Sequence, residues 1–150
     1  MAVRYFALIL GIIFLIVGIA GFIPGLTTTH AGGQADALRV HGPGHGYLLG
    51  LFHVNVLHNL VHVVFGVWGV VAYARYDASR IYARVVAISY AVFVLFGLCP
   101  SPTINTFFGL VPIHGHDVWL HAVLAIAGLY LGFAAKSTDV TEARADAPVA

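Results

Sequence analysis

The sequence of 150 residues contains little charge and a single cysteine. Charged residues make up 9% of the chain and hydrophobic residues 60%, a balance outside the range of ordinary soluble domains. Seven Lys and Arg nearly cancel six Asp and Glu, so no nucleic-acid partner is expected. Because Cys99 stands alone, an internal disulfide and any CxxC metal or redox motif are excluded.

Long apolar runs predict an all-α integral membrane protein. The first run has 19 residues without a charge, enough at about 1.5 Å per residue to cross most of a hydrocarbon core about 30 Å thick. It is too long for the core of a signal peptide, so we expect it to be retained. One domain over residues 1–135 then holds four transmembrane helices. The predicted spans cover residues 5–23, 47–74, 81–99 and 117–135.

Basic residues predict the orientation in the membrane. Six of the seven fall at the termini or between the second and third spans, and Arg39 alone falls on the opposite face. The positive-inside rule then places both termini in the cytoplasm of a bacterium, with the protein in its cytoplasmic membrane. Residues 136–150 are small and polar and are expected to form a disordered cytoplasmic tail. The six basic residues are Arg4, Arg75, Arg80, Arg84, Lys136 and Arg144.

Histidine is unusually abundant, with nine copies, and it is the commonest metal ligand. The predicted topology places all nine on the extracytoplasmic side. Sliding the chain by 59 residues aligns the last helix on the second, which predicts a four-helix bundle made of two pseudo-repeated helical hairpins. The aligned pairs are Asn55 with His114, His58 with Asp117, His62 with His121, and Gly69 with Gly128.

Two of these pairs predict a metal site. His58 and His62 are four residues apart, as are Asp117 and His121, so each pair shares one face of its helix. Three imidazoles and one carboxylate suit a four-coordinate copper or zinc ion. His114 is a possible additional ligand.

Two asparagines are expected to support these ligands. On a helix that runs through residue 53, Asn55 and Asn59 share the stripe of His58 and His62, where they would orient the imidazoles, whereas His53 points away. No role is assigned to the remaining candidates, which are His30, His41, His45, His53, His116 and Cys99.

Several functions fit this pattern. The metal could serve redox chemistry on superoxide or another small, diffusible oxygen species, because the chain offers no separate nucleophile. A haem b held between His62 and His121 would instead make the protein an electron carrier. A non-catalytic accessory subunit of a larger membrane complex, or a homo-oligomer, also fits the small, apolar chain.

Two motifs resemble a known family. The pattern N-x-x-H-N-x-x-H at residues 55–62 and the pattern D-x-W-L-H at residues 117–121 resemble a bacterial membrane family catalogued as domain of unknown function 4383. The likeness covers residues 1 to about 135, with a less typical His-Gly-His at residues 114–116. It implies the four-span fold and the same site residues, and it implies no activity.

Overall fold

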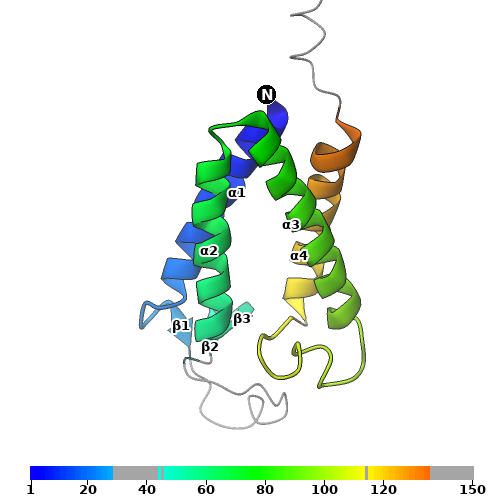
Figure 1. Ribbon diagram of the computed structural model, residues 1–150. Helices are drawn as coiled ribbons and strands as arrows, with labels where there is room; N and C mark the ends of the chain where they lie inside the picture. The colour runs from blue at the N-terminus through cyan, green and yellow to red at the C-terminus, as the bar shows by residue number, and fades with distance from the viewer. Residues whose placement is uncertain (29–43, 45, 114, 136–150) are drawn as a thin grey trace, which may run out of the picture.

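The computed structural model describes residues 1–28, 44, 46–113 and 115–135 of the chain. In this part the predicted four-helix architecture is confirmed: the helices run alternately up and down the long axis of the molecule (Figure 1). The N-terminus and the end of the last helix lie at the same end. The elements are α1 (Ala2–Ala20), α2 (Val56–Ala72), α3 (Tyr76–Gly97), α4 (His116–Leu129) and a π-helical turn, η2 (Tyr130–Ala134), that continues α4.

Three of the helical segments are long and apolar enough to cross a membrane: α1, α3, and α4 together with η2. The remaining helix, α2, is apolar but has only 17 residues. Large apolar side chains such as Ile16, Val64, Ile88 and Ile126 are exposed on the outer faces of the helices, whereas buried polar residues lie inside the bundle. This distribution is the one expected where hydrocarbon rather than water surrounds the helices.

The prediction of a helix from residue 47 is wrong. This stretch contributes two strands to a small antiparallel sheet of order β1-β2-β3, and α2 begins only at Val56. Leu49 and Gly50 adopt positive φ angles of 54° and 72°, so the chain reverses between β2 and β3 instead of continuing as a helix. The strands are β1 (Thr27–Thr28), β2 (Gly46–Leu48) and β3 (Phe52–Val54).

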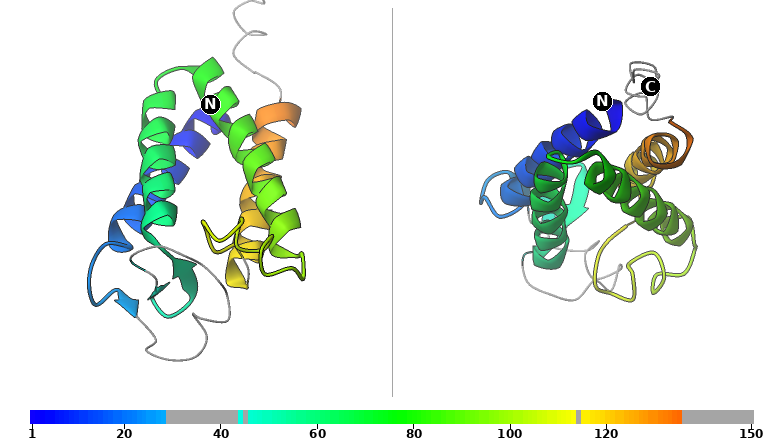
Figure 2. Two further views of the ribbon diagram at one scale, coloured as in Figure 1. Left: turned by 60° about the horizontal axis from the view of Figure 1, so that its bottom comes forward. Right: turned by 45° about the horizontal axis from the view of Figure 1, so that its top comes forward.

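Glycines bring the two helices of each hairpin into close contact (Figure 2). A Cβ atom at Gly69 would lie 2.7 Å from the carbonyl oxygen of Ala7 in α1, and one at Gly128 would lie 2.8 Å from that of Ala83 in α3. Glycines at these positions therefore let the backbones approach. The two aligned glycines thus contact the preceding helix of their own hairpin, while the pseudo-repeat stays a prediction.

Arginines link the helices at the end of the bundle where α1 begins and η2 ends. The Arg4 Nε atom donates to the carbonyl oxygen of Tyr73, between α2 and α3, at 2.8 Å. The Nε atoms of Arg80 and Arg84 both donate to the carbonyl oxygen of Gly132 in η2, at 3.0 and 2.8 Å. These bonds satisfy backbone carbonyls at the helix ends.

Candidate functional site

The candidate site begins at the first turn of α2, which Asn55 holds in place. The Asn55 Oδ1 atom accepts a hydrogen bond of 2.8 Å from the backbone N–H of His58, as an N-cap residue does. Its Nδ2 atom donates to the carbonyl oxygen of Leu110 at 2.7 Å. Asn55 thus fixes the start of α2 against the loop before α4. Both of these bonds are to backbone atoms, and the predicted contact of Asn55 with an imidazole stays a prediction.

The backbone of His53 holds one predicted ligand from each hairpin. The Nδ1–H of His58 donates to the His53 carbonyl oxygen at 3.2 Å, and the Asp117 carboxylate accepts a backbone hydrogen bond from His53. The prediction that His53 lies on the helix of His58 is wrong, because His53 belongs to β3, and its ring does not line the cavity of His58 and His62. Its buried ring stacks on Tyr47, with 4.7 Å between ring centroids.

The second hairpin contributes Asp117 and His121 from the start of α4. Both side chains are buried, at 3% exposure each, although one carries a formal charge. Asp117 lies in the first turn of α4, where the helix dipole favours the ionised form of a carboxyl group. The ring of Tyr90, on α3, lies edge-on to His121 with 4.8 Å between centroids.

His62 completes the group from α2. Its ring centroid lies 4.5 Å from that of His58 and 5.2 Å from that of Phe14 on α1. The Nδ1 atoms of His62 and His121 are both buried and have no hydrogen-bond partner among the residues described here. Most buried polar atoms in folded proteins have a partner, so two such atoms in one cluster point to a ligand.

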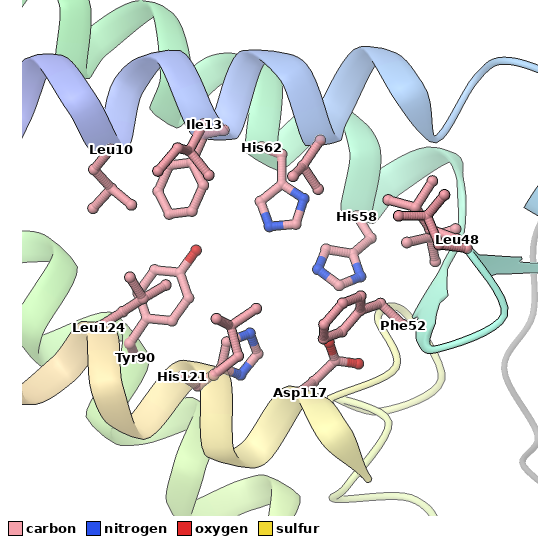
Figure 3. Close-up of a pocket in the computed structure, with 15 residues that line it drawn as sticks. Leu10, Ile13, Leu48, Phe52, His58, His62, Tyr90, Asp117, His121 and Leu124 are labelled. Atoms are coloured by element: carbon pink, nitrogen blue, oxygen red, sulfur yellow. The ribbon is translucent and has the colours of Figure 1, made fainter. Parts of the chain in front are cut away.

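All four predicted ligands line one cavity of about 230 Å³ (Figure 3). The His58 and His62 side chains enter it from one side and Asp117 and His121 from the other, with the Tyr90 hydroxyl pointing into the space between them. A second cavity of about 130 Å³ shares the three histidines and Tyr90 but not Asp117. The polar cluster therefore separates two cavities at the junction of the hairpins. Within the described ranges, no three His, Cys, Asp or Glu side chains are placed to hold a metal ion as they stand.

The other candidates lie apart from this cavity or outside the described residues. Asn59 is buried with no partner for its Oδ1 in the part described, and it faces Gly21 at the end of α1. His116 is exposed at the start of α4, and Cys99 is half-buried just after α3. The structure does not describe His30, His41, His45, His114 or residues 136–150.

Sequence reasoning missed Tyr90. The signal available was its position near the middle of the third predicted span, since tyrosines of membrane helices usually gather at the membrane interfaces. Tyr90 belongs to the site because its hydroxyl faces the cavity that the four predicted ligands line.

The fold and the site define a class of protein: an up-and-down bundle of apolar helices with a buried cluster of histidines and one aspartate at one end. The chain belongs to the family described as Domain of unknown function (DUF4383), which matches residues 4–134. The family resemblance of the two motifs is thereby confirmed. Searches of curated proteins and of solved structures found no match.

Proposed function

We propose that this chain is an integral membrane protein that binds a copper or zinc ion through His58, His62, Asp117 and His121. The observation that carries the proposal is the convergence of these four side chains, from two hairpins, on one cavity. An ionised carboxylate buried inside a membrane bundle is costly, and a bound cation would offset that cost at Asp117.

Hydrogen bonding supports a ligand role for His58. Histidines that bind metals almost always donate the N–H of their other ring nitrogen to a carbonyl or carboxylate oxygen. The Nδ1–H of His58 already donates to the His53 carbonyl oxygen, which leaves Nε2 as a free lone pair. The Nδ1 atoms of His62 and His121, which have no partner among the described residues, are two further candidates to bind a metal.

Metal binding requires the side chains to move. The described side chains do not yet form a three-ligand group, so rotation about χ1 and χ2 has to bring the imidazoles together. Cavity space beside the rings permits this movement. His114 remains an additional ligand candidate.

The chemistry depends on the metal. Copper would allow redox reactions with superoxide or another small oxygen species, whereas zinc would allow Lewis-acid or structural roles. Haem b is less favoured, because a cavity of about 230 Å³ is smaller than the roughly 300 Å³ at which cofactor pockets begin. An accessory role in a larger complex would not explain why, within the described residues, two buried imidazole nitrogens have no hydrogen-bond partner.

The distribution of arginines supports an orientation with the site on the extracytoplasmic side of a bacterial cytoplasmic membrane. Arg4, Arg75, Arg80 and Arg84 belong to the start of α1, the α2–α3 turn and the first turns of α3, and Figure 1 shows these segments at one end of the bundle. The starts of α2 and α4, which carry the proposed metal ligands, lie toward the other end. The positive-inside rule assigns the arginine end to the cytoplasm.

Metal analysis and an absorption spectrum of the purified protein test the proposal. We expect bound copper or zinc that is lost in the variants His58→Ala, His62→Ala and His121→Ala. The matched control is His116→Ala, which removes an exposed histidine from the start of the same helix as His121 and should keep the metal. Metal-free protein, unchanged metal in all three variants, or an intense haem band would refute it.

A further inference from the structure

The larger cavity has an apolar opening, which faces lipid if α1 and α4 cross a membrane as proposed. Most of its lining side chains are buried, but Ile13 of α1, Leu49 of the β2–β3 turn and Leu120 of α4 are 47%, 66% and 44% exposed. Figure 3 shows α1 and α4 on opposite sides of the cavity. Ile13 and Leu120 therefore mark an opening between these two helices, on a face of the bundle that hydrocarbon would cover in the proposed membrane protein.

The lining of the cavity selects for an uncharged molecule with one polar end. Leu10, Phe14, Leu48 and Leu124 form apolar walls, and the imidazoles and the Tyr90 hydroxyl form a polar wall. A pocket with apolar walls and a few convergent polar groups is typical of a small-molecule site. The apolar opening disfavours an anion such as superoxide as the molecule that takes this route.

The volume sets the size of the molecule. A dry apolar cavity of about 150 Å³ accepts benzene. A cavity of about 230 Å³ therefore has room for one aromatic ring with small substituents.

We infer that a phenol or hydroquinone dissolved in the bilayer enters the cavity between α1 and α4, with its hydroxyl directed at His121 and Tyr90. Such a ring is uncharged at neutral pH, partitions into lipid and carries the oxygen that the polar wall can bind. The inference rests on the proposed metal site, since it names the class of molecule that reaches that site. It concerns binding alone and requires no oxidant.

Fluorine NMR of para-fluorophenol with the full chain in lipid nanodiscs tests the inference, with protein-free nanodiscs as the blank. We expect saturable binding that is weakened roughly tenfold or more by Ile13→Trp and by Leu120→Trp, because each indole fills the opening. The matched controls are Ile16→Trp and Val123→Trp, whose positions are 62% and 63% exposed on the same two helices and do not line the cavity.

Metal content measured on the same samples separates the two proposals. Retained metal with no saturable binding, or with equal binding in the opening and control variants, overturns the inference alone. Saturable binding in a metal-free protein overturns the metal site and confines the inference to a phenol-binding cavity. Metal in every sample, with phenol binding lost only in Ile13→Trp and Leu120→Trp, supports both.

Discussion

Replacing Asn55 tests how the site is built. Asn55 is 2% exposed and makes two hydrogen bonds, one that caps α2 through the His58 N–H and one that donates to the Leu110 carbonyl oxygen. Loss of an N-cap costs about 1 kcal/mol, and loss of the second bond costs about 1 kcal/mol more. Asn55→Ala should therefore destabilise the protein by about 2 kcal/mol, which for a chain of this size lowers Tm by roughly 4–8 °C.

The variant Asn55→Ser separates the two contributions. Serine is a good N-cap residue, but its side chain is too short to replace the bond to Leu110, so we expect about half of the loss. Thermal unfolding in one detergent, followed by circular dichroism, ranks the three proteins. Equal Tm values for the alanine variant and the unmodified chain would refute the reasoning, as would a serine variant no more stable than the alanine variant.

Three further outcomes follow from the structure. Tyr82→Phe should leave Tm unchanged or raise stability by about 1 kcal/mol, because the Tyr82 hydroxyl is buried with no partner in the described part of the chain; clear destabilisation would contradict this. Gly69→Ala should lower the free energy of unfolding by about 1–3 kcal/mol, because the added methyl group pushes α1 away. The control Val71→Ala, at a 66% exposed position, should change it little. Equal effects of the two substitutions in the same thermal assay would refute the close contact. A fluorescent protein that matures only in the cytoplasm should fluoresce when fused after residue 150, and an extracytoplasmic C-terminus would leave it dark.

The number of helices could be predicted from the sequence, but the start of α2 could not. Apolar runs separated by glycine, proline and arginine were sufficient for the four helices and their alternating direction. The stretch at residues 46–54 is equally apolar, and apolar character alone does not distinguish a short strand from a helix. The available signal was Gly50 between residues that favour strands, such as Tyr47 and Phe52.

The gathering of the four site residues was also predictable, because spacing of four residues on each helix and the pairing of the hairpins both placed them at one end. The spacing of residues in the sequence could not predict that β3 contributes to the site. His53 takes part through its peptide groups, and a pattern of side-chain types carries no information about backbone hydrogen bonds. Tyr90 was missed because no partner at helical spacing drew attention to it.

The backbone of His53 hydrogen-bonds to a site residue from each hairpin, and this affects which sequence changes the site can tolerate. Any residue at position 53 has the same carbonyl oxygen, so comparison of side chains among relatives would overlook this contribution. Turn length is the vulnerable property instead. One residue inserted at residues 49–51 would shift the register of β3 and turn the peptide groups that hold His58 and Asp117 to the opposite side of the strand. In this family, conserved spacing between Tyr47 and Asn55 would be a better mark of an intact site than conserved histidine at position 53.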